Sequence, residues 1–169
     1  MEQQISFADL EYGRKKKRTK REQFLTYLDE ITPWDELVEQ IKPYYYKNSK
    51  GRKPRGIETM LRMYLLQTWF RLSDNALEDA VYDSYAMRQF MHLDFMRQSV
   101  PDATTLRRFR RIIAESGVAQ DYFTALSSFL KEQGITLRRG TISEASLPTA
   151  PGAKKKRRKH GVKVPLPHD

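Results

Sequence analysis

Apolar residues recur at helical spacing through most of residues 21–134, which predicts a series of amphipathic helices. Segment 57–72 is the most apolar part of the chain and predicts the central core helix. The residues expected on its broad apolar face are Met60, Leu61, Tyr64, Leu65, Thr68 and Trp69. Other predicted helices cover residues 21–31 and 33–41, and a last one stops before Gly134. The pattern therefore predicts a mainly α, compact, multi-helix domain with a helix-turn-helix-like segment.

Capping residues indicate where these helices begin and end. Thr32 is expected to cap a helix that starts at Pro33, and Pro43 is expected to end that helix. Three further helices follow typical N-cap residues, which are Ser73, Ser84 and Asp102. After Gly134 the period changes, and residues 135–143 predict a short extended pair.

The segment 102–113 has two chemically different faces. Its apolar side, expected to face the core, consists of Leu106, Phe109, Ile112 and Ile113. The opposite side carries one hydroxyl and three guanidinium groups, on Thr104, Arg107, Arg108 and Arg111. Arginine forks match guanine edges and phosphate oxygens, so this pattern predicts a DNA recognition helix. A helix that is merely soluble would carry similar arginines, and the pattern alone leaves both interpretations open.

Positive charge is concentrated in two short runs. The chain has 31 Lys and Arg, 21 Asp and Glu, and a net charge of +10. Residues 14–21 hold seven of the basic residues and residues 154–159 hold six, so the remaining 18 are fewer than the acids. Such runs indicate a polyanionic partner, with nucleic acid ahead of an anionic membrane, or else solvated arms. The candidate DNA contacts of the first run are Arg14, Lys15, Lys16, Lys17, Arg18, Lys20 and Arg21.

Two other basic segments have more than one interpretation. The run 154–159 is also compatible with a nuclear localisation signal. Residues 43–56 mix three tyrosines with five basic residues, a combination that can stack on bases and grip a nucleic-acid backbone. The alternative is that these tyrosines pack at the edge of the domain and the loop is only exposed.

Several kinds of chemistry are excluded or disfavoured. The chain has no cysteine, which removes disulfides, thiolate zinc sites and cysteine nucleophiles. No apolar run is long enough for a membrane span, and the three histidines have no metal-binding spacing. The acids on one predicted helix are interpreted as a solvated face, and they are Asp74, Glu78, Asp79 and Asp83. No cofactor or metal is therefore expected for this chain alone.

Four sequence blocks resemble one family. They are FADLEYG at 7–13, ITPWDELV at 31–38, GIETMLRMYLLQTWFRLSDNALEDAVYDS at 56–84 and SVPDATTLRRFRRII at 99–113. In this order they resemble the N-terminal region of bacterial insertion-sequence transposases of the InsH type. Those enzymes have a helical DNA-binding region ahead of a DDE catalytic domain with an RNase H-like fold. The resemblance implies binding to double-stranded DNA at terminal inverted repeats, in the bacterial cytoplasm and nucleoid.

The resemblance ends near residue 151 with a departure from the family. Glu144 falls where the family has its first catalytic Asp, and Pro148 falls where a central strand is expected. This implies a fragment that lacks the catalytic domain and is inactive alone, with Mg²⁺ needed only by the complete enzyme. A downstream reading frame reached by frameshifting would instead supply the missing domain.

The expected organisation has four parts. A basic N-terminal arm covers residues 1–20, and the helical DNA-binding domain covers 21–134. Residues 135–147 are expected to be a remnant of the first catalytic strand, and 148–169 a disordered basic tail. The leading hypothesis for function is DNA binding to transposon ends. The alternative is a regulatory fragment that forms dimers with itself or with full-length transposase and inhibits the latter.

Overall fold

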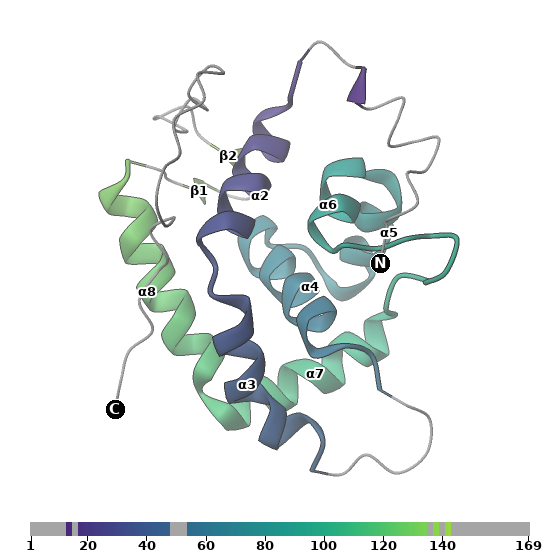
Figure 1. The fold of residues 1–169 in the computed structure, drawn as a ribbon, viewed down its shortest axis with the longest axis vertical. Helices are drawn as coiled ribbons and strands as arrows, with labels where there is room; N and C mark the ends of the chain where they lie inside the picture. The colour runs from purple at the N-terminus through teal and green to yellow at the C-terminus, as the bar shows by residue number, and fades with distance from the viewer. Residues whose placement is uncertain (1–12, 15–16, 48–53, 135–136, 139–140, 143–169) are drawn as a thin grey trace.

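The computed structural model describes residues 13–14, 17–47, 54–134, 137–138 and 141–142 (Figure 1). Its elements, in chain order, are α2 Lys20–Ile31, α3 Trp34–Tyr45, α4 Ile57–Phe70, α5 Asp74–Asp83, α6 Tyr85–Phe90, α7 Ala103–Ser116, α8 Val118–Glu132, β1 Leu137–Arg138 and β2 Thr141–Ile142. The mainly α class is confirmed. None of the described helices is both long and apolar enough to cross a bilayer.

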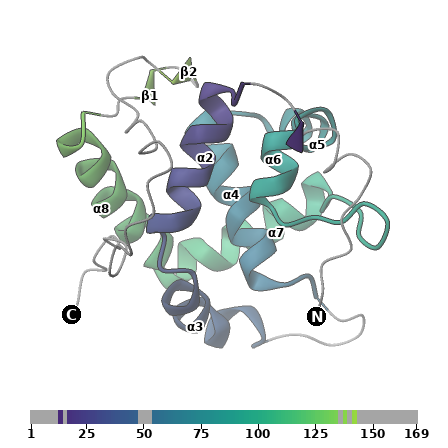
Figure 2. The same cartoon turned by 45° about the horizontal axis from the view of Figure 1, so that its top comes forward.

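Helix α4 lies at the centre, and the other helices are arranged around it (Figures 1 and 2). Met60, Leu61 and Leu65 are fully buried, as its apolar face predicted. The placement of Thr68 on that face was wrong, because Thr68 is exposed. Residues off the predicted face, Arg62 and Met63 among them, are buried. A helix covered on nearly all sides keeps only a narrow solvent face, so a one-sided apolar stripe underestimates its burial.

The predicted boundaries of α3 were wrong at both ends. Thr32 ends α2 instead of capping α3, and its hydroxyl donates to the Leu28 carbonyl at 2.6 Å. Pro33 occupies the N-cap position of α3 without a side-chain cap. Pro43 lies inside α3, which continues to Tyr45. Proline removes one backbone N–H from this last turn, and in the same turn the Tyr45 ring packs against Phe109 with ring centroids 5.7 Å apart.

The capping residues predicted for the later helices are confirmed, whereas α4 ends at Phe70, before the predicted residue 72, and α2 begins at Lys20, inside the predicted arm. Backbone N–H groups donate to the side chains of Ser73, Ser84 and Asp102 at the starts of α5, α6 and α7. Gly117 and Gly134 both have positive φ, 70° and 74°, at the ends of α7 and α8. The left-handed conformation at these sites favours glycine. The predicted extended pair is the antiparallel ladder β1–β2, in which Leu137 pairs with Ile142.

One charged side chain lies inside the helical core. Arg62 of α4 is only 2% exposed. Its guanidinium contacts Asp29 Oδ1 at 2.7 Å and Glu58 Oε1 at 2.8 Å, and its Nη1 donates to the Phe90 carbonyl at 2.6 Å. The same group lies 3.9 Å from the ring centroid of Trp34. Arg62 thus connects α4 with α2, α3 and α6, because each of these supplies one of its partners.

We expect Arg62→Ala to destabilise the domain by about 3–5 kcal/mol, because it leaves two carboxylates near the core without their cation. The free energy of unfolding from urea denaturation measures this loss. Arg108→Ala, on the exposed face of α7, is the matched control and should change stability by less than about 0.5 kcal/mol. Equal stabilities of the two variants would contradict a central role for Arg62.

Candidate nucleic-acid interface

Helix α7 has a capped N-terminus and a buried apolar face, which is called its seat below. The Oδ1 atom of Asp102 accepts the backbone N–H of Thr105 at 2.7 Å, and hydrogen bonds from Thr105 lower the pKa of Asp102. Leu106, Phe109 and Ile113 are buried against the core. Ile112, also predicted to face inward, is only half-buried. The orientation of α7 is therefore set by its packing.

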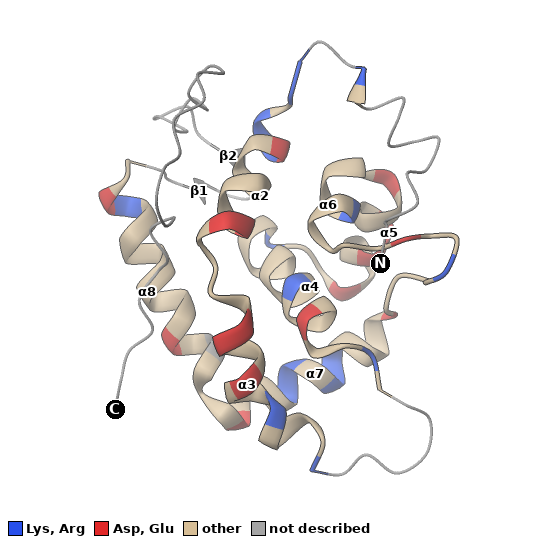
Figure 3. Cartoon of the chain, in the orientation of Figure 1, with Lys and Arg blue, Asp and Glu red and all other residues tan. Residues whose placement is uncertain are grey.

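The face opposite this seat is polar and cationic. All four of its predicted residues are exposed, and they are Thr104, Arg107, Arg108 and Arg111. In Figure 3, Lys and Arg positions gather along α7, at the neighbouring end of α3 and in the segment leading into α4. The structure thus brings together the recognition-helix residues that the sequence predicted. Whether they contact DNA stays a prediction.

A fourth arginine of α7 has a different environment. Arg110 Nη1 and Nη2 donate to the two carboxylate oxygens of Asp74 at 2.6 and 3.0 Å. Gln67 of α4 joins them, since its Nε2 donates to Asp74 Oδ1 at 2.6 Å and its Oε1 accepts from Arg110 Nη1 at 2.7 Å. This Asp74–Arg110–Gln67 network fixes α7 to α4 and α5.

The solvated face predicted for the acids of α5 was wrong for Asp74. Its side chain is only 19% exposed, whereas Asp79 and Asp83 are exposed. Hydrogen bonds from Arg110, and then from Gln67, lower the pKa of Asp74 to about 2. Asp74 is therefore ionised at all pH values near neutrality. Its second oxygen also lies 3.6 Å from Nε of Arg107, on the exposed face.

Arg55 is a candidate that the sequence did not single out. Its Nη2 donates to Ser99 Oγ at 2.6 Å, which places it beside the segment that leads into α7. Tyr45 donates its hydroxyl proton to the Arg55 carbonyl at 2.8 Å and packs at the domain edge, as one of the two alternatives predicted. The only earlier signal was the basic and aromatic composition of residues 43–56. Residues 48–53 lie outside the described residues.

The basic arm lies elsewhere. Arg14, Lys17 and Arg18 are exposed, while residues 15–16, which are Lys15 and Lys16, lie outside the described residues. Lys20 belongs to the first turn of α2. In Figure 1 the start of α2 lies at the top and α7 in the lower part of the molecule, with α4 between them. Among the residues with described positions, the structure therefore does not bring the two predicted sets of DNA contacts together.

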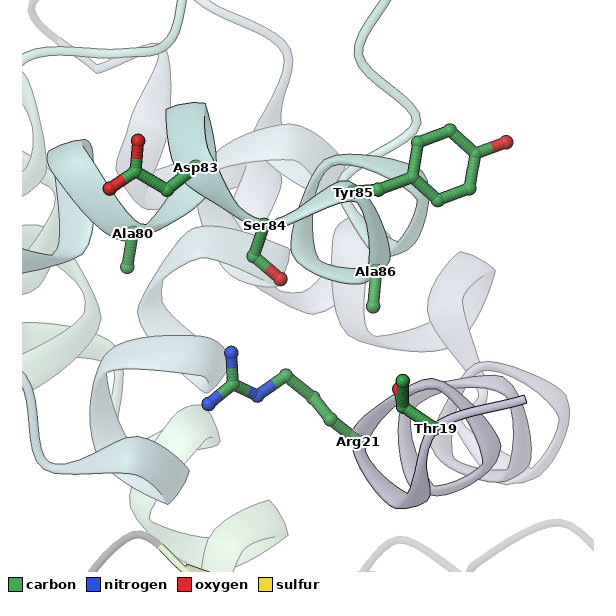
Figure 4. A pocket seen from close by; sticks show the side chains of 7 residues that line it. All are labelled: Thr19, Arg21, Ala80, Asp83, Ser84, Tyr85 and Ala86. Carbon is green, nitrogen blue, oxygen red and sulfur yellow. The ribbon is translucent and has the colours of Figure 1, made fainter. Parts of the chain in front are cut away.

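Arg21 has an environment of its own at the start of α2. Its guanidinium lies 5.3 Å from the ring centroid of Phe70. The side chain extends into an open hollow of about 590 Å³ between α2 and the α5–α6 junction, where it points toward Ser84 (Figure 4). Arg21 is exposed, and its guanidinium is nevertheless in contact with its own domain.

The described residues offer no metal site, and the C-terminal predictions lie outside them. Within the described parts of the chain, no three His, Asp or Glu side chains form a group that could hold a metal ion. Glu144 and the basic run 154–159 lie outside the described residues. The same holds for the tail 148–169.

A helix-turn-helix motif joins its two helices by a turn of roughly 3–4 residues. Residues 71–73 provide such a turn between α4 and α5, whereas α7 follows the longer connection 91–102. The helix-turn-helix-like character of the arginine-bearing segment therefore stays a prediction.

Comparison with known proteins identifies a transposase family. The family model described as "Transposase domain (DUF772)" matches residues 13–111. The match covers more than half of the chain and includes α2 through α6 and the arginine face of α7. No solved structure matches the chain.

We expect Asp74 to contribute about 2 kcal/mol of stability near neutral pH, because its pKa is about 2 in the folded chain and about 3.9 in an unfolded one. The depressed pKa means that this contribution is lost as pH falls from about 4 to about 2. Asp74→Asn should therefore flatten the pH dependence of the unfolding free energy in that interval. Asp79→Asn, on the exposed side of the same helix, should keep the full acid dependence. Identical profiles for both variants would contradict the role of Asp74.

Proposed function

The chain belongs to the family of transposase domains and therefore has a role in transposition; on that premise we propose that it binds double-stranded DNA at the terminal inverted repeats of an insertion sequence. It would act there as the InsH-type N-terminal region of a transposase. The observation that carries the proposal is the exposed arginine face of α7 above a buried seat. The proposal concerns DNA binding, and it assigns no catalytic step to the described residues.

The geometry of α7 suits the major groove of DNA. That groove is about 12 Å wide and admits one α-helix, whose side chains reach the base edges. Arg107 and Arg111 are one helical turn apart on the exposed side, so both reach toward the same surface. The buried side of α7 and the Asp74–Arg110–Gln67 network keep the helix from rolling. A fixed helix presents its guanidinium forks at constant spacing, which direct readout of bases requires.

We assign backbone contacts to the remaining cations. Arg55 lies beside the start of α7, where it is suited to a phosphate that flanks the groove. The arm residues Arg14, Lys17 and Arg18 begin at the other end of the molecule and would contact a separate stretch of DNA. Such contacts add affinity without sequence preference.

One observation favours the alternative, a regulatory fragment that dimerises. Tyr82 and Phe95 are exposed and pack against each other with ring centroids 5.4 Å apart, and the neighbouring Met96 is 89% exposed. An apolar patch of this kind is a feature of protein contact surfaces. A chain that forms dimers in gel filtration but selects no DNA sequence would support this alternative over DNA recognition.

We expect the unmodified chain to select a consensus from a pool of randomised duplexes. Arg107→Ala or Arg111→Ala should then weaken binding to the selected duplex by about 1–3 kcal/mol wherever the side chain is bidentate to guanine. Binding to a scrambled duplex should change much less. Fluorescence anisotropy measures both affinities, and circular dichroism should show unchanged helicity because these side chains are exposed.

Lys131→Ala, an exposed cation near the end of α8, is the matched control and should leave both affinities unchanged. Equal losses on the two duplexes would make the α7 face a phosphate contact only. A selection that yields no consensus would rule out sequence-specific binding.

The arm should act mainly through salt-dependent contacts. Each phosphate contact contributes about −0.9 to the slope of log affinity against log salt concentration on duplex DNA. Replacing Lys15, Lys16, Lys17 and Arg18 by Ala should therefore flatten the slope by up to about 0.9 per lost contact. The ratio of affinities for selected and scrambled duplexes should stay the same. An unchanged slope would show that the arm does not touch DNA.

A further inference from the structure

We infer that Asp74 is a positioning residue for base recognition. It orients the guanidinium of Arg107 so that the two Nη groups of Arg107 meet a guanine. This inference rests on the proposed function. It adds that Arg107 reads the base and that Asp74 orients Arg107 for this contact. Asp74 itself contacts no DNA in this arrangement. It acts through Arg107, whose Nε lies 3.6 Å from Asp74 Oδ2.

Asp74 is a fixed anchor for such a contact. Both of its oxygens are engaged, Oδ1 by Gln67 and Arg110 and Oδ2 by the second Arg110 nitrogen. The residue follows the N-cap Ser73 at the start of α5, where an acid is favoured by the helix dipole. The position of its carboxylate therefore comes from α4, α5 and α7 together, and does not depend on Arg107.

The contact between Asp74 and Arg107 leaves the Nη groups of the Arg107 guanidinium available for DNA. Asp74 approaches the Nε side, and the two Nη groups make up the opposite edge. That Nη edge is the pair of donors that matches O6 and N7 of guanine. An arginine held from the Nε side loses less conformational freedom when the guanine contact forms, because its side chain is already oriented in the free protein.

The neighbouring arginines lack this support. Among the described residues, Arg108 and Arg111 form no ion pair with a carboxylate, and both are exposed. We therefore assign the most discriminating base contact of the three to Arg107. The negative charge of Asp74 also repels nearby phosphates, so it weakens binding to DNA of any sequence while it improves discrimination.

The test compares the selected duplex and a scrambled duplex as probes for the full chain. Asp74→Asn keeps the size of the side chain and removes its charge. We expect affinity for the scrambled duplex to stay the same or rise, while the affinity ratio of selected to scrambled duplex falls about tenfold. Asp79→Asn, an exposed acid on the same helix, should leave the ratio unchanged. In an Arg107→Ala background, Asp74→Asn should no longer change the ratio.

Two outcomes would overturn the role of Asp74. Equal losses on both duplexes, with a lower melting temperature, would mean that Asp74 only supports the fold. Equal gains on both would mean that it only competes with DNA for Arg107. If Arg107→Ala itself leaves the ratio unchanged, the proposed readout by α7 fails and this inference fails with it. If Arg107→Ala lowers the ratio and Asp74→Asn does not, the inference alone fails.

A measurement on the unmodified chain covers the case in which Asp74→Asn does not fold. The order parameter of the Nε–Hε bond, from NMR relaxation, reports how restricted each arginine side chain is. We expect the value for Arg107 to exceed those for Arg108 and Arg111. Equal values for the three arginines would contradict the inference.

Discussion

The packing of four helices, α2, α3, α4 and α6, depends on the buried guanidinium of Arg62, because each of them contributes to its environment. A buried charge is tolerated only when it is paired and its hydrogen bonds are made. Arg62 meets this condition through Asp29 of α2, Glu58 of its own helix and the carbonyl of Phe90 in α6, with Trp34 of α3 against its flat face. Burial raises the pKa of Asp29, but hydrogen bonds from His92 and Arg62 outweigh it and bring the pKa below its ordinary value. Because these partners come from separate elements, Arg62 specifies how α4 sits in the core.

The candidate interface depends on that placement. Helix α7 packs against α3 and α4, with Leu106 and Phe109 buried in the core. It is also held by Arg110, which reaches Gln67 of α4 and Asp74 of α5. The two polar networks resemble each other, since in both an arginine is paired with at least one carboxylate and joins several helices. In the first network the arginine holds the core together, and in the second it fixes the angle at which the exposed face of α7 is presented.

Two groups of cations lie in different parts of the molecule, and they suit different kinds of DNA contact. The cations around α7 lie on a rigid surface, while Arg14 and Lys17 precede α2 at the opposite end of the molecule. Rigid arginines suit recognition of base edges, and a run of basic residues suits attraction to any phosphate backbone. Arg21 shows that a basic run is not uniform, because its guanidinium lies against the Phe70 ring of the domain itself.

The sequence by itself determined the helical class, most helix starts and the two faces of α7. These depend on local physics, namely the helical period of apolar side chains and the hydrogen bonds of Ser73, Ser84 and Asp102 to nearby backbone. It failed where distant contacts override local preference, as in the helix that continues past Pro43. Only the tertiary structure decided that Arg62 is buried and that Asp74 pairs with Arg110, 36 residues away along the chain. An exposed and a buried charge look the same in a sequence, because the partners that make burial tolerable are brought together only by the fold.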